Sequence, residues 1–417
     1  MSGKDPYDVI IVGAGIAGLH AALRISEKNP KLTIAITEAY DYVGGRIFTF
    51  HHPKYKILQW ESGAGRIHES HTLLKKYIKR YNLTTIPISS KQQWISQYTK
   101  IPEPDIWTEL SEILMDFIAS SNPSVLGTHT IHDILRLTKG KTYADKILAH
   151  FPYSAEVNTL RADLAIQSFR NEMGSSENFF VIKEGFDAVP TAMREELESR
   201  GVQFFFNHRL LRVSKHGLGQ TMCTFQDSTL IANKVILALH SEALRQIHPF
   251  TNLPMLKHLA MQPLLRTYGI FQTPAWFSHI PRTVTNSPIR HMIPINPNQG
   301  TIMTSYTDGK DTEKWTSILK KKGEAGLQQE IMQALRDLFK NSHIPDPIFF
   351  KSHLWKDGCT YWLPGRYDPQ ASSEKFMNPL PTSLNNVYVC GESYSMRQAW
   401  VEGALEHTEA MLKKFFL

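Results

Sequence analysis

The chain has 417 residues, of which 42% are hydrophobic, and this length exceeds what one hydrophobic core usually supports, so two domains are expected. Its 46 Lys and Arg against 39 Asp and Glu leave a formal net charge of +7, and its basic clusters, such as Lys320 to Lys322, are short. A nucleic-acid partner calls for basic residues gathered on one face, so we expect none.

The cysteines, Cys223, Cys359 and Cys390, are odd in number and have no C-x-x-C spacing, which favours neither a disulfide framework nor a zinc site. We therefore expect a reducing compartment and no metal. The apolar stretch Val9 to Leu19 is interrupted by glycines and is too short to cross a membrane. Its charged leader does not resemble a signal peptide, so a soluble cytoplasmic protein without a membrane partner is predicted.

The N-terminal segment predicts a strand, a tight turn and a helix. Tyr7 to Val12 is a run rich in apolar and β-branched residues, and a glycine-rich turn leads from it into the helix-like Leu19 to Ile25. In such a turn the first glycine permits the sharp bend, the second lets a pyrophosphate approach the backbone, and the third lets the helix pack on the strand. The turn consists of Gly13, Ala14, Gly15, Ile16, Ala17 and Gly18.

An acid follows at the spacing that a bound dinucleotide requires. The second predicted strand, Leu32 to Thr37, ends in Glu38, which lies twenty residues beyond Gly18. A carboxylate there can accept hydrogen bonds from the ribose hydroxyls of an adenosine, and it disfavours the additional phosphate of NADP. The phosphates would lie on the helix N-terminus, where free N–H groups favour negative charge. The whole segment therefore predicts a dinucleotide site.

Paired glycines after this acid indicate which dinucleotide is bound. Gly44 and Gly45 bring backbone amides near the pyrophosphate, and Arg46 can neutralise it. Here the chain resembles the flavin-containing amine oxidase family, which includes monoamine, polyamine and L-amino-acid oxidases. The family pattern is an acid, a small residue (Ala39 here), a short spacer, Gly-Gly-Arg and a Thr; this sequence departs from it at Tyr42, where a basic residue is usual. The resemblance implies that FAD is the cofactor.

The resemblance also implies an α/β fold, in which a two-lobed, Rossmann-like FAD-binding domain is joined to a second, α+β substrate domain. The segment Gly63, Ala64, Gly65 and Arg66 is similar to the family's loop beneath the flavin, where small residues let the backbone lie against the isoalloxazine ring. By the same similarity, the chain returns to the cofactor domain near residue 180, and the backbone of Leu210 meets the adenine.

A second match lies near the C-terminus. The segment Val387 to Ser393 is similar to the family's last strand, followed by a glycine and an acid, Gly391 and Glu392, that face the ribityl chain and pyrophosphate. A helix comes next, and its N-terminus places positive potential near N1 and C2=O of the flavin, where negative charge accumulates on reduction. The cofactor-binding residues at the start of this helix are Trp400, Val401 and Ala404.

The matched segments predict a cofactor domain that is discontinuous in sequence. It comprises residues 1–75, 176–245 and 355–417, and the substrate domain comprises residues 76–175 and 246–354. Hydrophobic periodicity predicts helices over Ile106 to Ala119, Thr130 to Leu148 and Ala325 to Lys340. A strand is predicted over Thr267 to Gln272.

Amine oxidation needs a dry pocket on the flavin face, where the substrate C–H passes a hydride equivalent to N5 and oxygen takes the electrons, giving an imine and hydrogen peroxide. The family flanks the substrate nitrogen with aromatic rings. By the resemblance, Trp400 supplies one ring, and Tyr361 or Trp362 supplies the other. An amine and molecular oxygen are thus the expected small-molecule partners. A buried tryptophan is also an ordinary core residue, so simple packing is the alternative.

Two residues bear on the chemistry at the flavin. Arg266 stands where the family usually has a lysine that holds a water against flavin N5. A guanidinium stays charged at any working pH, whereas a buried ammonium can lose its proton, so Arg266 leaves room for an acidic substrate or another electron acceptor. A structural arginine bound to an acid or to backbone carbonyls is the alternative. Cys359 suggests a thioether to the flavin, but its spacing to Pro364 favours noncovalent FAD.

Two other functions remain open from the sequence. Desaturases and protoporphyrinogen-type oxidases use the same cofactor clamp to dehydrogenate carbon skeletons, and they would need a wide, apolar entrance. A protein that keeps FAD as a structural ligand, with an interaction role, is the non-catalytic alternative. The aromatic candidates favour the amine, because rings suit an amine nitrogen.

Overall fold

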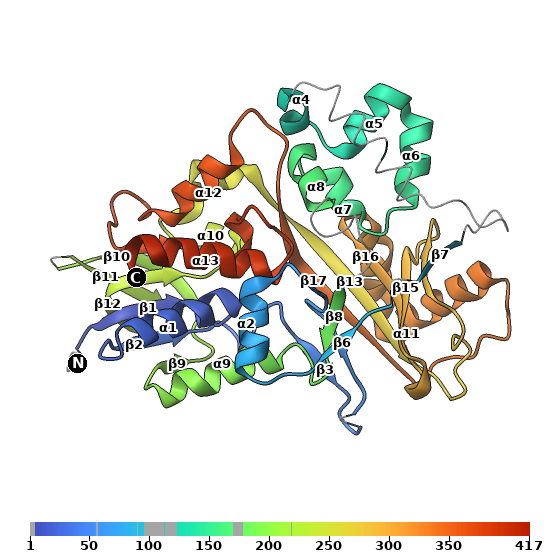
Figure 1. Cartoon of the computed structure of the whole chain (residues 1–417), viewed down its shortest axis with the longest axis horizontal. Helices are drawn as coiled ribbons and strands as arrows, with labels where there is room; N and C mark the ends of the chain where they lie inside the picture. Colours follow the sequence, from blue (N-terminus) through green and yellow to red (C-terminus); the bar gives the residue numbers. More distant parts are fainter. Residues whose placement is uncertain are drawn as a thin grey trace.

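The computed structural model describes residues 5–55, 57–89, 91–95, 112, 123–169, 178–217 and 219–417. Two sheets dominate the arrangement in Figure 1. The first sheet contains the N-terminal strand, β1 (Tyr7–Val12). The second sheet contains β13 (Leu259–Ile270) and β17 (Phe349–Trp362), the two longest strands of the described residues. This arrangement is the α/β fold with two lobes that the sequence predicts.

The first sheet combines parallel and antiparallel pairing. Its central strands β2, β1 and β12 are parallel, β9 extends the edge beside β2, and β11 and β10 extend the other side as an antiparallel meander. The C-terminal strand β18 pairs in parallel with the end of β12. The strands are β1 (Tyr7–Val12), β2 (Ile34–Thr37), β9 (Gln203–Phe205), β10 (Leu210–His216), β11 (Gln220–Phe225), β12 (Thr229–Leu237) and β18 (Val387–Val389).

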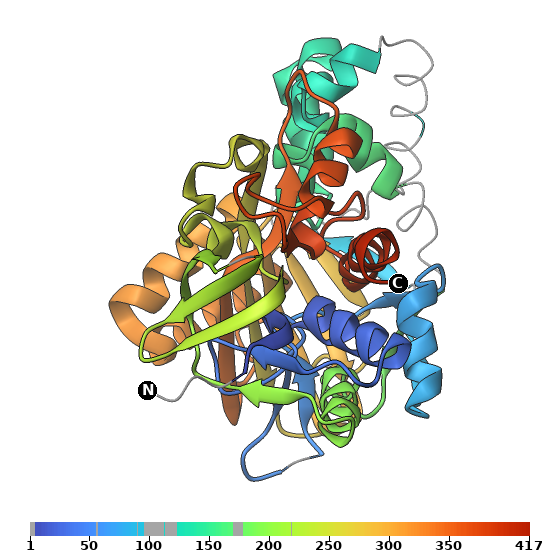
Figure 2. The ribbon, with the colours of Figure 1, turned by 90° about the vertical axis from the view of Figure 1, so that its left-hand side faces the viewer.

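Helices cover the first sheet because its central strands are apolar on both faces. One face packs against α1 (Ile16–Lys28), α9 (Ala188–Ser199) and α13 (Val401–Phe415) in a shared hydrophobic cluster. Figures 1 and 2 show α13 lying beside α1. Most of α1 is buried, since it lies between the sheet and these neighbours. The chain's last helix is thereby fixed next to its first.

The second sheet is largely antiparallel. Its order is β17–β13–β16–β15–β14–β7, and only the pairing of β14 with β7 is parallel within the described part of this sheet. Helix α11 (Thr312–Phe339) packs on it through a separate apolar cluster. The strands are β7 (Gln92–Ile95), β13 (Leu259–Ile270), β14 (Arg282–Thr285), β15 (His291–Asn296), β16 (Thr301–Asp308) and β17 (Phe349–Trp362).

A group of short helices forms the upper right of Figure 1. They are α4 (Pro123–Thr128), α5 (Ile131–Lys139), α6 (Lys141–Ala149), α7 (Ser154–Thr159) and α8 (Ala162–Ser168). The prediction of helix over Thr130 to Leu148 is confirmed, as two helices separated by Gly140. Thr130 and Asp133 form a capping box at the start of α5. The helix predicted over Ile106 to Ala119 lies outside the described residues.

The remaining elements connect these layers. The helices are α2 (Thr72–Arg80), α10 (Ser241–Arg245) and α12 (Pro369–Met377), and short 3-10 turns span Phe250–Asn252, Pro254–His258, Pro297–Gln299, Gly309–Asp311 and Glu392–Tyr394. The short strands are β3 (Thr49–His51), β4 (Gln59–Glu61), β5 (Ile67–His68), β6 (Thr85–Pro87) and β8 (Phe179–Ile182). The predicted strand and helix in the second lobe are confirmed as β13 and α11.

The predicted domain boundaries stay a prediction, although one of them cuts an element. Strand β17 runs through residue 355, where the sequence placed the return to the cofactor domain, and it pairs with β13 on both sides of this residue, with a register shift after Trp355. Its far end reaches the first lobe, since Thr360 N donates to Glu392 Oε1. In the part of the chain that the structure describes, no helix is long and apolar enough to span a bilayer.

Buried acids on α13 hold this helix against its neighbours. The Glu402 carboxylate, which is fully buried, accepts hydrogen bonds from Leu73 N at 2.7 Å and Leu74 N at 2.9 Å. It therefore caps the first turn of α2, whose own N-cap residue makes no side-chain cap. Farther along α13, Glu409 bonds His20 and Arg24 of α1. These contacts fix the end of α13 that faces the site.

We expect the change Glu402→Gln to lower the free energy of unfolding by about 1–3 kcal/mol, because a neutral amide cannot accept both buried N–H groups of α2. Urea denaturation followed by circular dichroism measures this change. Glu195→Gln is the matched control, since Glu195 is an exposed acid on α9. Equal midpoints for the two variants would contradict the capping role of Glu402.

Candidate flavin site

A large cavity extends between the two sheets. Its volume is about 1640 Å³, which exceeds the roughly 300–1,000 Å³ of ordinary ligand pockets. One end is lined by the turn after β1 and by the end of β2, and the other by β13, β16 and the far half of β17. Residues of both lobes therefore line the cavity.

The N-terminal end of the cavity has the polar groups of a dinucleotide site. Glu38 Oε2 accepts a hydrogen bond from Ala14 N at 2.7 Å, and Oε1 accepts one from Tyr40 N at 3.1 Å. These bonds fix the carboxylate at the end of β2, where it lines the cavity. Burial raises the pKa of Glu38, although the backbone hydrogen bonds oppose this effect. Helix α1 begins here without a side-chain cap, so its first N–H groups remain available to an anion.

Two glycines of the turn have the different structural roles that the sequence predicts, one in helix packing and one in leaving space for a pyrophosphate. A Cβ atom on Gly18 would overlap the carbonyl oxygen of Gly13, so only glycine lets α1 pack this closely on β1. Gly18 itself does not line the cavity. A Cβ atom on Gly15 would meet only Gly44 O, at 4.0 Å, and would project into the cavity space over the start of α1. Glycine at this position leaves the space that a pyrophosphate needs.

Arg46 and Glu392 form an ion pair on the cavity wall. Arg46 Nη2 lies 2.9 Å from Glu392 Oε2, and Arg46 Nη1 donates to Gly358 O at 3.1 Å. Glu392 Oε1 also accepts hydrogen bonds from Thr360 N at 3.1 Å and from Ala399 N at 2.8 Å. The acid thus connects the loop after β2, strand β17 and the start of α13. Arg46 lines the cavity, and its ion pair with Glu392 partly balances its positive charge.

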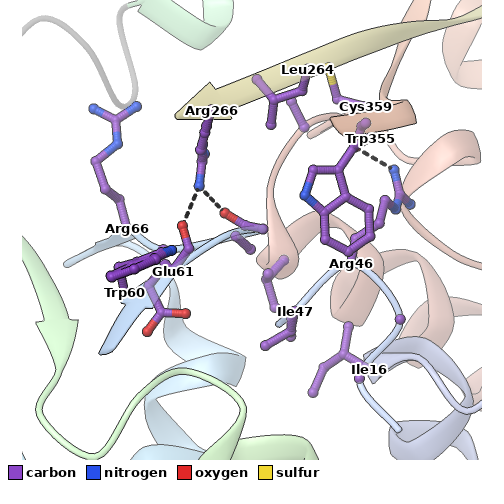
Figure 3. A pocket seen from close by; sticks show the side chains of 18 of the residues that line it. Ile16, Arg46, Ile47, Trp60, Glu61, Arg66, Leu264, Arg266, Trp355 and Cys359 are labelled. Carbon is purple, nitrogen blue, oxygen red and sulfur yellow. Dashed lines mark hydrogen bonds between the residues drawn. The ribbon is translucent and has the colours of Figure 1, made fainter. Parts of the chain in front are cut away.

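The loop at residues 63–66 lies against β13 and β17. Arg266 Nη1 donates to Glu61 O at 3.0 Å and also to Gly63 O. Figure 3 shows Arg266 reaching from its strand toward Glu61, with Trp355 beside it. Trp355 Nε1 donates to Ser62 O at 2.7 Å. Arg266 therefore holds backbone carbonyls, as in the structural alternative, and also lines the cavity. Its catalytic role stays a prediction.

Aromatic side chains line the other end of the cavity. Trp400 stacks on Phe179 with ring centroids 6.0 Å apart, and Tyr361 lines the cavity from β17. The alternative candidate for the second ring, Trp362, does not line it: Trp362 is fully buried in the core, and its indole N–H donates to Ser395 O. Successive residues of a strand point to opposite faces, so β17 can present only one of the two rings to the cavity.

Most of the predicted site residues line this one cavity. They are Gly13, Gly15, Ala17, Glu38, Ala39, Gly44, Gly45, Arg46, Gly63, Ala64, Gly65, Arg66, Leu210, Arg266, Tyr361, Gly391, Glu392, Trp400, Val401 and Ala404. Ala14 does not line it but donates to Glu38. The assignment of direct cofactor contact to Ala14 and Gly18 therefore becomes one of support for the residues around them.

Sequence reasoning missed several residues at the aromatic end. Four further residues line the cavity and belong to no sequence motif: Tyr153, Arg282, Tyr306 and Asp308. Tyr153 directly precedes α7, and the other three lie on strands β14 and β16 of the second lobe. Arg282 offers a weak sequence signal, because a charged residue begins the strand Arg282–Thr285, whose other residues are Thr, Val and Thr. That signal is common on protein surfaces and does not indicate a site.

Cys359 lies on the cavity wall next to Leu264 in Figure 3. Burial, followed by the charge of Glu392, raises the pKa of its thiol. The thiol is therefore protonated near neutral pH and is a poor nucleophile. This agrees with the sequence-based expectation of noncovalent FAD.

These residues fit FAD. A carboxylate at the end of the second parallel strand, an uncapped helix start and an open glycine position suit the adenosine diphosphate half. Both glycines of the loop at residues 63–65 line the cavity, and close packing requires them, because a Cβ on Gly63 would overlap Arg46 O and one on Gly65 would overlap the Glu61 side chain. The fold and site together define a flavoprotein of the two-lobed oxidoreductase class, with FAD between its lobes.

The chain belongs to the flavin containing amine oxidoreductase family, whose sequence profile matches residues 16–409. It is an FAD-dependent oxidoreductase of the amine oxidase type, and its substrate is a small molecule.

Individual relatives share low sequence identity with this chain, but the alignments cover most of its length. L-amino-acid oxidase from Mus musculus is 24% identical over 470 residues, covering 97% of this chain and 70% of that protein. L-amino-acid oxidase from Crotalus adamanteus is 25% identical, covering 62% of this chain and 56% of that protein. A putrescine oxidase structure shares the fold, with a TM-score of 0.79 at 17% identity over 98% of both chains.

Removing the charge of Glu38 should weaken FAD binding. We expect Glu38→Gln to raise the FAD dissociation constant about ten- to a hundredfold, because a hydrogen bond to an ionised group contributes roughly 1.5–3 kcal/mol. Fluorescence titration of the apoprotein with FAD measures this. Asp41→Asn is the control, since Asp41 is exposed nearby and does not line the cavity. A similar loss in both variants would point to general charge rather than to this contact.

Acid precipitation of the FAD-loaded protein tests the noncovalent assignment. We expect the yellow colour to remain in the supernatant, because a protonated Cys359 thiol does not attack the ring. Absorbance at the flavin maximum in both fractions gives the result. Colour retained in the pellet of the native protein but not of a Cys359→Ser variant would establish a covalent bond instead.

Proposed function

We propose that this chain oxidises the C–N bond of an α-amino acid, with molecular oxygen as the electron acceptor. Amino acid, oxygen and water give a 2-oxo acid, ammonium and hydrogen peroxide. The C–H and N–H bonds of the substrate are oxidised, oxygen gains two electrons, and water oxygen replaces the nitrogen on the carbon. The bound FAD supplies the electron acceptor that links these two half-reactions.

The observation that carries this proposal is the position of Arg66. Its guanidinium carbon lies 5.1 Å from the ring centroid of Tyr153, 5.2 Å from that of Phe179 and 5.8 Å from that of Trp400. It lines the cavity and makes no ion pair with any residue in the described ranges. A cation held among aromatic rings and open to a cavity suits a carboxylate, which a guanidinium binds through two parallel hydrogen bonds.

The same position disfavours a purely cationic substrate. Trp400, one of the rings that the sequence assigned to the substrate nitrogen, already lies near Arg66 together with Tyr153 and Phe179, and a second cation beside Arg66 would be repelled. An amino acid offers a carboxylate to Arg66 and keeps its amino group one carbon away. The L-amino-acid oxidase relatives support this substrate class, whereas the putrescine oxidase resemblance concerns the fold.

Other residues of the chain keep the reacting end dry and fixed. Tyr361 is buried, and burial raises the pKa of its phenol well above the ordinary value, so it remains neutral. Trp355 is fixed by its bond to Ser62 O. The positive end of α13, beginning after Trp400, provides a favourable potential for negative charge developing in the bound ring. These groups bind and orient, and none is required to transfer a proton.

Oxidation of a carbon skeleton is the second candidate, and the apolar rim of the cavity favours it. Ile57, Ile86 and Ile295 line the cavity although they are 75%, 43% and 41% exposed. A wide aliphatic entrance suits a large apolar substrate. The uncompensated charge of Arg66 favours the amino acid, since a dry apolar substrate would leave it unpaired.

Peroxide release during a screen of amino acids, primary amines and polyamines tests the proposal. We expect amino acids to be oxidised and putrescine not to be. Arg66→Gln should lower kcat/KM for amino acids about ten- to a hundredfold through KM, because it removes a charge-assisted pair made by substrate and transition state alike. Arg366→Gln, which changes an exposed arginine, is the control. Oxidation of amines that lack a carboxylate at equal or better efficiency would overturn it.

A further inference from the structure

A second arginine of the cavity has no protein partner in the described ranges. Arg282, the first residue of β14, lines the cavity and is partly buried. Its guanidinium makes no hydrogen bond and no ion pair with the residues described. By contrast, Arg266 is bound to two carbonyls, and Arg290 is bound to backbone carbonyls and to Asp311. Arg66 and Arg282 are therefore the cations of this region that remain open to a ligand.

Arg66 and Arg282 line the same cavity, and the charge of Arg66 acts on Arg282. Burial lowers the pKa of Arg282 below the ordinary arginine value, and the charge of Arg66 lowers it further. Tyr153 is a neighbour of both, since it opposes this shift of Arg282 and lies under the Arg66 guanidinium. His291 is buried near them, and neither of its ring nitrogens has a hydrogen-bond partner among the residues that the structure describes. Burial, with the charges of Arg282 and Arg66, depresses its pKa. His291 is thus a neutral ring in a positive field.

The acids of the same cavity are engaged elsewhere. Asp308 accepts hydrogen bonds from Ser154 Oγ and Ala155 N, and burial raises its pKa to about 6. Glu61 accepts from Thr49 Oγ1 and Phe186 N, and burial raises its pKa to about 7. Glu156 accepts from Ser168 Oγ. None of these carboxyl groups forms an ion pair with Arg66 or Arg282 in the described ranges.

Two partly desolvated cations on one cavity wall are costly unless anions pair with them. One carboxylate can engage one guanidinium through a bidentate pair, so two arginines on separate elements suit a ligand with two anionic groups. Arg66 follows the loop at residues 63–65, whereas Arg282 begins β14, which lies between β15 and β7 in the second sheet. Their separation in the fold allows two groups of one small molecule to be held apart.

We propose that Arg282 binds a second carboxylate of the substrate, so that the preferred substrates are α-amino acids whose side chains end in a carboxylate. This inference rests on the proposed function, in which Arg66 takes the α-carboxylate. Arg282 is then a specificity-determining residue: it contributes little to monocarboxylic substrates and repels those with a cationic side chain.

Binding of unreactive acids to the FAD-loaded protein tests the site without turnover. Isothermal titration calorimetry compares glutarate, a dicarboxylate, with butyrate, a monocarboxylate. We expect glutarate to bind the native protein at least tenfold more tightly. Arg282→Gln should weaken glutarate binding about ten- to a hundredfold and butyrate binding less than threefold. Arg282→Lys, which keeps the charge, should recover part of the loss.

Arg212→Gln provides the matched control, because Arg212 is an exposed arginine of β10 outside the cavity, and this variant should bind both acids like the native protein. The flavin absorbance spectrum of each variant verifies that it is folded and loaded. Equal affinity of the native protein for the two acids, or an equal loss of both in Arg282→Gln, would overturn the assignment.

Peroxide release separates failure of this inference from failure of the proposed function. Faster oxidation of L-glutamate or L-aspartate than of L-leucine, with the preference lost in Arg282→Gln, supports the inference. Oxidation of L-leucine in preference to the acidic amino acids would overturn the inference and leave the proposed function standing. Absence of peroxide from every amino acid, with FAD bound, would overturn both.

Discussion

The arrangement of the site depends on the contacts of one buried carboxylate, that of Glu392. It pairs with Arg46 after β2, accepts hydrogen bonds from Thr360 on β17, and accepts another from Ala399 just before α13. Three parts of the chain that are far apart in sequence therefore meet at one charge. A buried carboxylate without these donors would be strongly unfavourable, so the three parts are constrained to come together.

The cavity that results has two ends of different chemical character. At the N-terminal end, backbone groups and one fixed carboxylate line the part of the cavity that suits adenosine diphosphate, and Gly15 leaves room there. At the other end, side chains from both lobes converge, and arginines dominate the charge. Replacing the usual lysine by Arg266 adds a fixed cation there, but that cation is used to hold the backbone at Glu61 and Gly63. The proposed preference of the substrate end for anions rests on the arginines left open, Arg66 and Arg282.

Sequence reasoning succeeded where local rules specify the structure. The turn between β1 and α1, with Glu38 at the end of β2, follows from glycine sterics and the geometry of parallel strands. Family resemblance then located Gly391 and Glu392. It could not decide between Tyr361 and Trp362, because the register of β17 against β13 determines which ring faces the cavity. The boundary at residue 355 stays a prediction; it falls within β17, which pairs with β13 on both sides of it.

The sequence by itself determined the cofactor class, the clamp for adenosine diphosphate and the family, because these depend on short segments whose backbone conformation is encoded locally. Only the tertiary structure decided which charges remain uncompensated. Arg46, Arg266 and Arg290 form hydrogen bonds or ion pairs with distant elements, whereas the guanidinium groups of Arg66 and Arg282 form neither among the described residues. Whether an arginine is paired depends on long-range packing, and no local pattern specifies it. The set of charges that the cavity leaves open to a ligand therefore follows from the fold.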